Sequence, residues 1–296
     1  TVTGPGGDAA ILRIPDTNKG IAMTTDGNAR LCYLDPFIGG TIAVSEACRN
    51  LSCVGATPVA ITNCLNFGDP EKPDVYYQLE QVVRGMSQAC ETFGIPVISG
   101  NVSLYNETQG KAIYPTPVIG AVGLLEEVAR HVNIAFRREG DAVVLLGSET
   151  LDQPISSLAG SEYLELYHNH VAGAPTINLD FERRLQECCR RAIKYGILTS
   201  AHDCSDGGLA VAIAESCMAG QIGIIGDGSL LGRWDAAFFG ESQSRIVVSL
   251  PRENLDQLKE IAEDLQIPFI LLGSVGGTQI TLTNVLSVSV EEASRI

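Results

Sequence analysis

Between residues 75 and 93, apolar side chains recur at helical spacing, and short apolar runs typical of strands lie before and after this segment. The apolar positions are Val75, Leu79, Val82, Val83, Met86, Cys90 and Phe93, and Gly94 follows them as a helix stop. The flanking runs at residues 59–63 and 96–99 predict strands. A strand, a long helix and a second strand in this order predict a sheet covered by helices.

The same alternation of strands and helices continues on both sides of a charged segment at residues 126–141. Before this segment, the patterns predict a small mixed sheet, with strands at 10–14, 21–25 and 117–124 and a further helix at 40–54. After it, they predict a second α/β region, with helices at 180–195, 209–219 and 254–265 and strands at 142–146, 245–250, 269–272 and 279–283. We therefore predict a mixed α/β fold with a boundary near residue 137, giving a smaller domain at 1–136 and a larger α/β domain at 137–296.

The charge and hydrophobicity of the chain exclude two classes of partner. The 35 acidic and 20 basic residues give a net charge of −15, which opposes binding to the phosphate backbone of nucleic acids. No apolar run approaches the roughly 20 residues that span a bilayer, and the N-terminus carries no basic segment followed by an apolar one. We expect no nucleic-acid partner and no membrane association.

The nine cysteines form no CxxC pair, and most lie within apolar helix or strand patterns. This pattern is typical of small buried thiols in a reducing compartment, and we expect a cytoplasmic protein. The chain begins at Thr1, inside a strand-like segment, rather than at a methionine. We therefore expect a piece of a longer protein or a processed form.

Three polar, glycine-containing segments are the candidates for ligand binding. They are Gly6–Asp8 near the start, Ser99–Glu107 after the apolar run at 95–98, and Asp203–Gly208 before an apolar helix. Loops at strand ends commonly hold ligands in α/β proteins. We expect the segment at 99–107 to be a loop, and the three segments to converge on a phosphate and its metal ion.

A possible cation site lies on the predicted helix at 40–54. Glu46 and Asn50 are four residues apart, so both face the same side of a helix. Carboxylate and amide oxygens suit Mg²⁺, which prefers oxygen ligands. Taken alone, this pair favours a polar helix face exposed to solvent over a cation site.

The two glycine-containing segments at 6–8 and 203–208 each have a simpler explanation. The run Gly4–Ala9 superficially matches a dinucleotide-binding loop, but a strand-like segment follows it instead of the required helix. Asp8 is then either a metal ligand or a turn residue. Ser205 or Asp206 is predicted to cap the following helix, although two carboxylates beside Gly-Gly exceed what a cap needs. The segment at 25–28, with Asp26, closes a strand in the same manner, and its simpler explanation is an Asx turn.

The remaining reactive side chains give no catalytic candidate. His131, His168, His170 and His202 match no zinc-site spacing, so structural or surface roles are favoured. No G-x-S-x-G nucleophile motif and no P-loop occurs.

Taken together, seven segments resemble the phosphoribosylformylglycinamidine synthase family, in particular the C-terminal half of its synthetase subunit. The match extends over nearly the whole chain, and it is carried by residues 6–10, 24–28, 60–68, 99–107, 115–120, 203–208 and 239–245. The resemblance implies two aminoimidazole-ribonucleotide-synthetase-like domains. It also implies ATP-dependent conversion of formylglycinamide ribonucleotide and ammonia to formylglycinamidine ribonucleotide in purine biosynthesis, in which ATP phosphorylates the amide oxygen and ammonia displaces the phosphate.

The family resemblance also assigns roles to individual positions. Asn63 and Gly100 would contact ATP, Asn101 its Mg²⁺, and Ser103 the ribonucleotide substrate. Many family members carry Asp where this chain has Asn63, so one charge is missing here. A second, auxiliary Mg-nucleotide, ADP in some members, would be held by Asp8, Glu46, Asn50, Asp203 and Ser205.

Other parts of the family's machinery do not occur in these 296 residues. The catalytic histidine segment of the N-terminal half and a glutaminase cysteine motif are both missing, so the resemblance implies that this chain alone is inactive. Its expected partners are the N-terminal half of the same enzyme and a glutaminase subunit or domain. An isolated half would expose an edge strand and could pair as a homodimer. The alternatives are a free-standing ATP-using relative and a structural nucleotide-binding module without chemistry.

Overall fold

A computed structural model describes residues 1–226, 230–282 and 285–295. It contains two large sheets, one formed by residues before 137 and one by residues after it. From Val132 onward the connecting segment packs into the cores beside the second sheet. The division into domains 1–136 and 137–296 stays a prediction, and in the structure Val132 and Phe136 already pack with the second sheet.

The first sheet has five strands and is mixed, as predicted. Its strands lie in the order β1 (Ala10–Arg13), β2 (Gly20–Asp26), β7 (Thr116–Leu125), β3 (Thr57–Asn66) and β4 (Val97–Ser103). Only the β3–β4 pair is parallel among these neighbours. A two-stranded hairpin, β5 (Glu107–Thr108) with β6 (Lys111–Ala112), follows β4.

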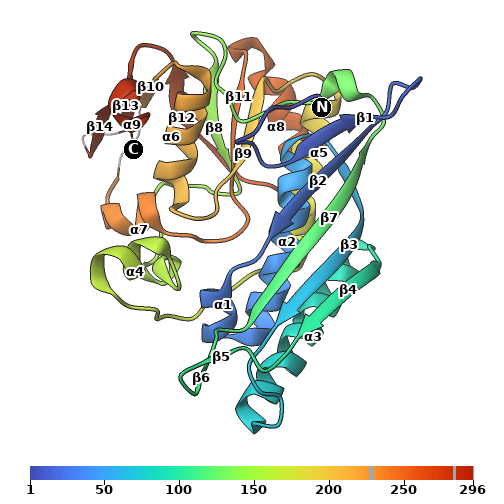
Figure 1. Cartoon of the computed structure of the whole chain (residues 1–296). Coiled ribbons are helices and arrows are strands. Elements are labelled where there is room, and N and C mark those ends of the chain that lie inside the picture. The colour runs from blue at the N-terminus through green and yellow to red at the C-terminus, as the bar shows by residue number, and fades with distance from the viewer. Residues whose placement is uncertain (227–229, 283–284, 296) are drawn as a thin grey trace.

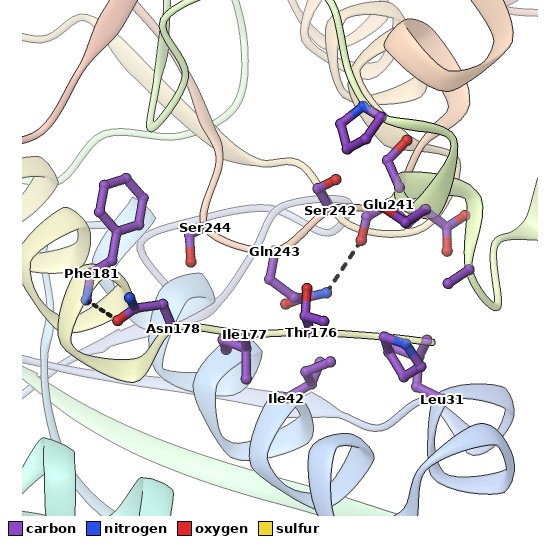
Figure 2. A pocket seen from close by; sticks show the side chains of 15 residues that line it. Leu31, Ile42, Thr176, Ile177, Asn178, Phe181, Glu241, Ser242, Gln243 and Ser244 are labelled. Atoms are coloured by element: carbon purple, nitrogen blue, oxygen red, sulfur yellow. Dashed lines mark hydrogen bonds between the residues drawn. The ribbon is translucent and has the colours of Figure 1, made fainter. Parts of the chain in front are cut away.

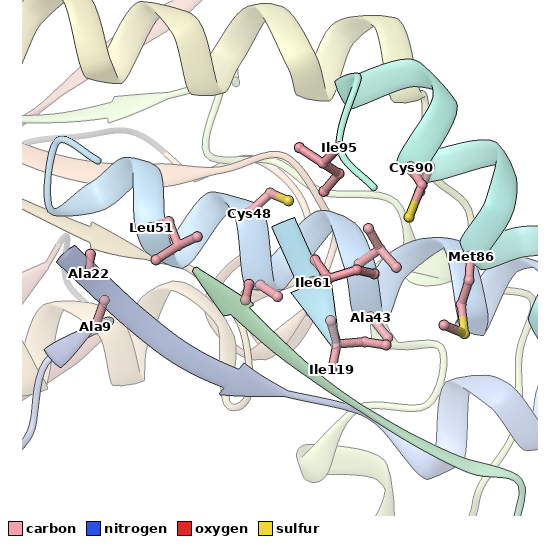
Figure 3. Close-up of a cluster of buried hydrophobic side chains, with 14 of the residues drawn as sticks. Ala9, Ala22, Ala43, Cys48, Leu51, Ile61, Met86, Cys90, Ile95 and Ile119 are labelled. Atoms are coloured by element: carbon pink, nitrogen blue, oxygen red, sulfur yellow. The ribbon is translucent and has the colours of Figure 1, made fainter. Parts of the chain in front are cut away.

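One face of this sheet is covered by helices and the other is open. Along β7, alternate residues are buried, because side chains of a strand point to opposite faces. The buried face packs on α2 (Pro36–Cys53) and α3 (Pro73–Phe93), and a short helix α1 (Ala29–Leu34) precedes α2 (Figure 1). Figure 3 shows Ala22, Ile61 and Ile119 of the sheet beside Ala43 and Leu51 of α2.

The second sheet has seven strands and is covered on both faces. In β8 (Ala142–Leu146), Val144 faces the core formed with α5 (Leu179–Lys194) and α8 (Leu255–Asp264). Val143 faces the opposite core, formed with α6 (Gly208–Gly220), α7 (Trp234–Phe239) and α9 (Val290–Ala293). The other strands are β9 (Ser200–Asp203), β10 (Ile224–Gly226), β11 (Ile246–Leu250), β12 (Phe269–Val275), β13 (Gln279–Leu282) and β14 (Leu286–Ser289). Helix α4 (Glu162–His168) lies in the connection between β8 and α5.

Several predicted elements are confirmed, and some of their bounds are wrong. Gly94 ends α3 in a left-handed conformation, as its position predicts. Helix α2 begins at Pro36 rather than at residue 40, because the Asp35 side chain accepts a hydrogen bond from the Ile38 amide and caps it. The predicted strand at 279–283 ends at Leu282, and Thr283 lies outside the described residues.

The prediction of a loop at residues 99–107 is wrong for its first half. Strand β4 continues to Ser103, because its backbone pairs with β3 from Thr62–Ser99 to Asn66–Ser103. Gly100, Asn101 and Ser103 therefore lie within an edge strand, not in a loop.

Candidate functional site

A buried arginine, Arg49, connects the two domains. Arg49 of α2 has no exposed surface, and its guanidinium donates to Asp203 at the end of β9, to Glu182 of α5 at 3.0 Å and to Gln243 at 3.1 Å. Burial alone would lower the pKa of Arg49, but the Asp203 and Glu182 carboxylates outweigh burial and raise it. The guanidinium is therefore a fixed positive charge at the domain junction.

Three carboxyl groups crowd the same junction. Burial and, to a lesser extent, the neighbouring Asp203 raise the pKa of Asp26 to about 7. Burial likewise raises the pKa of Asp203 to about 6 against the opposing effect of Arg49, and it raises that of Glu46 well above its ordinary value. Asn50 donates a 2.8 Å hydrogen bond to Asp26. One arginine does not neutralise this cluster, so a bound cation would relieve its repulsion.

A second carboxylate pair lies at the edge of this cluster. His202 of β9 lies 2.8 Å from Asp8 through Nδ1 and 2.9 Å from Glu215 of α6 through Nε2. Burial would lower the pKa of His202, but Asp8 and Glu215 outweigh it and raise the pKa to about 10. The imidazole is therefore protonated at neutral pH.

These residues border an open pocket of about 470 Å³, which we call the junction pocket. Three of the predicted residues line it, namely Asp8, Asn50 and Ser205, together with His202 and Glu215. Glu46 and Asp203 lie behind them, in contact with Arg49. The structure thus brings together all five residues that the family resemblance assigns to an auxiliary Mg-nucleotide.

Unpartnered oxygens indicate that the junction pocket fits a cation. Asp8 Oδ2 and Asp203 Oδ2 are buried and have no hydrogen-bond partner. Buried carboxylate oxygens normally have partners, and Mg²⁺ takes oxygen ligands. Among residues 1–226, 230–282 and 285–295, no three His, Cys, Asp or Glu side chains are arranged to hold a metal ion unaided. An ion here would need further oxygen ligands, such as phosphates and water.

The loop at 203–208 is held by other hydrogen bonds than those predicted. Gly207 is the N-cap of α6, with no side-chain cap, so the prediction that Ser205 or Asp206 caps the helix is wrong. The Gly207 amide instead donates a 2.8 Å hydrogen bond to Glu241. Gly207 has a positive φ of 77°, which glycine adopts without strain. Glu241, in the segment at 239–245, therefore holds the loop at 203–208 through a hydrogen bond, although the two segments are far apart in the sequence.

The other predicted residues lie elsewhere, on β3 and β4. Asn63 pairs with Gly100, and a Cβ on Gly100 would lie only 2.2 Å from Asn63 Oδ1. Asn101 pairs with Cys64, so by strand alternation it points to the open face, away from Asn63. Strand β7 separates β3 from β2 and Asp26, and strands β7 and β3 both separate β4 from β2. The expected convergence of three segments is therefore wrong: the segments at 6–8 and 203–208 meet, and the segment at 99–107 does not join them.

A second, smaller cavity of about 220 Å³ lies between the domains, and the sequence gives no signal for it. Figure 2 shows Leu31 and Ile42 of the first domain on one side and Glu241–Ser244 on the other. Gln243 binds Arg49, so this cavity borders the same ionic network.

The comparisons with known proteins divide the chain as two domain types. Residues 6–125 match the AIR synthase related protein N-terminal domain, and residues 138–283 match the AIR synthase related protein C-terminal domain. The chain belongs to the AIR synthase related proteins. The predicted two-domain α/β fold of this type is confirmed.

Longer relatives are similar over most of the chain. The phosphoribosylformylglycinamidine synthase subunit PurL of Moorella thermoacetica is 52% identical over 278 residues, which are 94% of this chain and 37% of that protein. The predicted resemblance to this synthase family is confirmed. The chain thus spans about two fifths of the length of this relative.

Solved structures show the same fold at low sequence identity. The T. maritima PurL complexed with FGAR aligns with a TM-score of 0.82 at 19% identity, over 99% of this chain and 48% of that one. T. maritima PurL complexed with ATP aligns with a TM-score of 0.76 at 19% identity, over 99% and 47%.

Sequence reasoning did not place several residues in or beside the junction pocket. The pattern at Asp26 leaves open a ligand-binding segment or an Asx turn, and in the structure its side chain accepts a hydrogen bond from Asn50. A structural or surface role is predicted for His202, and the structure places it in a buried bridge between two carboxylates. Arg49 gives one usable signal, because a lone arginine three residues after Glu46 interrupts an otherwise buried helix.

No helix within the described residues has the length and apolar character needed to cross a membrane. All nine cysteines are free thiols, and eight of them are buried, as their apolar surroundings predict.

Proposed function

We propose that this chain is part of a PurL-type phosphoribosylformylglycinamidine synthase and binds a magnesium-nucleotide in the junction pocket. The observation that carries this proposal is the pair of buried, unpartnered oxygens of Asp8 and Asp203 beside Asn50 and Ser205. The 52% identity to a PurL subunit supports the family of reaction. The ATP complex of T. maritima PurL supports nucleotide binding by this fold.

At the junction pocket, we assign Asp8 and Ser205 to the Mg-nucleotide, with Asp8 on the side of its Mg²⁺, and we assign Glu46, Asn50 and Asp203 to that Mg²⁺. Their oxygen atoms are the ligands that Mg²⁺ prefers. When bound, the ion would neutralise phosphate charge. The pKa values of Glu46 and Asp203 are raised because burial and mutual repulsion disfavour their charged forms. A bound cation would offset this repulsion, which supports the assignment.

We assign the β3–β4 residues to a composite active site that this chain does not complete alone. Asn63 and Gly100 would contact ATP, Asn101 its metal ion, and Ser103 formylglycinamide ribonucleotide. The remaining three fifths of a PurL-length chain would supply the catalytic histidine segment, and a glutaminase partner would supply ammonia. The open face of β4 supports this assignment, since Asn101 is exposed. We therefore propose that the chain alone binds nucleotide without turnover, in the cytoplasm.

Calorimetric titration of ADP and ATP, with Mg²⁺ and with EDTA, tests the proposal alongside an assay of phosphate release. We expect magnesium-dependent binding without phosphate release. Turnover by the chain alone would instead identify a free-standing ATP-using enzyme. Absence of nucleotide binding would contradict the assignment of the junction pocket.

A structural nucleotide-binding module is the second candidate. The burial of Arg49, Glu182 and Asp203 favours it, because a ligand added to such a network would stabilise the fold. Reconstitution with the missing part of a PurL chain distinguishes the two. If the site is structural, loss of Mg-ADP binding at the junction would lower only the stability of the assembly. If the site is catalytic, the same loss would lower the substrate-dependent rate at saturating ATP.

We also propose that the isolated chain forms a homodimer through its open sheet. Strand β4 is an edge strand, and Val97, Ile98 and Val102 are exposed large apolar side chains along it. Unpaired edges of this kind associate readily. Analytical ultracentrifugation at micromolar concentration tests this expectation, and a monomer there would contradict it.

A further inference from the structure

The imidazole of His202 is held on both sides by carboxylates. Nδ1 lies 2.8 Å from Asp8 Oδ1, and Nε2 lies 2.9 Å from Glu215 Oε2. Carboxylates accept hydrogen bonds, so both ring nitrogens donate. Only 9% of His202 is exposed, and a flip or rotation of the ring would break both contacts. The ring therefore has one orientation.

This orientation decides which oxygen of Asp8 is available. Oδ1 is used by His202, whereas Oδ2 is buried and has no partner. Gly6 and Gly7, which precede Asp8, carry no side chain that could hold its carboxylate, and the space beside them is open. The direction of the carboxylate is thus set by its hydrogen bond to the imidazole.

The support for His202 comes from the second domain. Its backbone belongs to β9, where it pairs with Val247 of β11. Glu215 belongs to α6, which packs into a core of that domain. A chain of two hydrogen bonds therefore connects the second domain to a glycine-rich segment of the first.

We propose that His202 is a positioning residue: it turns Asp8 so that Oδ2 meets a nucleotide-bound divalent cation in the junction pocket, and Glu215 fixes the imidazole. This inference rests on the proposed function. Hydrogen bonds behind a metal ligand orient it, and their loss typically weakens metal affinity about 10- to 100-fold. His202 does not itself contact the cation.

The test compares ADP binding by the purified chain in Mg²⁺ and in EDTA, and takes the ratio of the two affinities as the magnesium gain. We expect His202→Ala to reduce the magnesium gain about tenfold or more, and to leave ADP affinity in EDTA within about twofold. Glu215→Gln keeps an acceptor for Nε2 and should reduce the gain less. Asp8→Ala should remove it, and adding His202→Ala to Asp8→Ala should cause no further loss.

Two controls separate positioning from general damage. His131→Ala removes a histidine whose Nδ1 contacts the Val128 carbonyl at 2.7 Å, outside the pocket, and should keep the full magnesium gain. Thermal melting followed by circular dichroism reports whether each variant folds. If His202→Ala does not fold, Glu215→Gln and His202→Gln decide the question, because both retain a polar group at the site.

The outcomes distinguish the positioning role of His202 from the proposed Mg-nucleotide binding. Wild-type protein without a magnesium gain overturns both. A wild-type gain that persists in the folded His202 and Glu215 variants overturns only the positioning role. Equal weakening of ADP binding in Mg²⁺ and in EDTA also overturns it, since that result indicates a role in shaping the pocket.

Discussion

At the domain junction, charged side chains are shielded from solvent and paired with one another, whereas along β4 nearly every residue is exposed. Arg49 has no exposed surface and contacts both domains. Asn101, by contrast, is exposed on an edge strand, and its side-chain amide donates a 3.7 Å hydrogen bond to the Cys64 sulfur. The junction is therefore shaped by atoms of this chain, and β4 offers ligand-binding groups that need a further surface to enclose them.

Replacing the central arginine gives the largest expected effect. Arg49→Met removes the guanidinium that contacts both Asp203 and Glu182 and leaves these buried carboxylates without that counter-charge. Breaking a buried ion pair in this way costs about 3–5 kcal/mol of unfolding free energy. Urea denaturation measures it. Arg191→Met is the matched control, because Arg191 also contacts two carboxylates but is 39% exposed, and it should change stability little. Equal losses in the two variants would contradict the comparison.

Removing a buried carboxylate of the junction should stabilise the ligand-free chain at high pH. The pKa of Asp26 is raised by burial from 3.8 to about 7. The stability linked to its proton is therefore complete below pH 3.8 and is lost as the pH rises through about 7. Asp26→Asn cannot ionise and should gain roughly 2 kcal/mol over the wild type at pH 8, with no gain at pH 4. Denaturation in EDTA across this range measures the difference, and a gain independent of pH would contradict the stated cause.

A glycine substitution examines how tightly the β3–β4 pair is packed. In Gly100→Ala, the new methyl group would meet Asn63 Oδ1, which lies at the end of a flexible side chain. Asn63 can turn away, so we expect a loss of about 1 kcal/mol. A thermal melt measures it. A loss as large as that of Arg49→Met would mean that the edge strand is as constrained as the junction.

The smallest expected effect concerns the open face. Asn101→Ala should leave the melting temperature of the chain unchanged and its Mg-ADP affinity within about twofold of the wild type. Asn101 is exposed and lies outside the junction pocket. In a reconstituted full-length enzyme, the same substitution should lower the rate of synthesis. Weaker Mg-ADP binding by the isolated variant would show that the two regions are coupled.

The parts of the fold that were predictable are those determined by local pattern. The spacing of apolar residues and Gly94 identify α3, and the continuous apolar run identifies β8, which is buried throughout. Strand β4 could not be bounded in this way, because polar residues continue it by pairing with β3. The site was predictable only as residue types. Its geometry depends on partners far apart in the sequence, such as Arg49 and Asp203, which are 154 positions apart.

The Arg49 network has a consequence for how the chain folds. Its guanidinium belongs to the first domain, and the carboxylates of Glu182 and Asp203 belong to the second. Either domain alone would lack the ion pairs that Arg49 makes with Glu182 and Asp203, because these pairs form only when the two domains dock. Docking of the domains is then expected to coincide with the completion of each core, and unfolding to proceed as a single cooperative transition. Proteases should accordingly find few cleavable intermediates between the intact chain and the unfolded one.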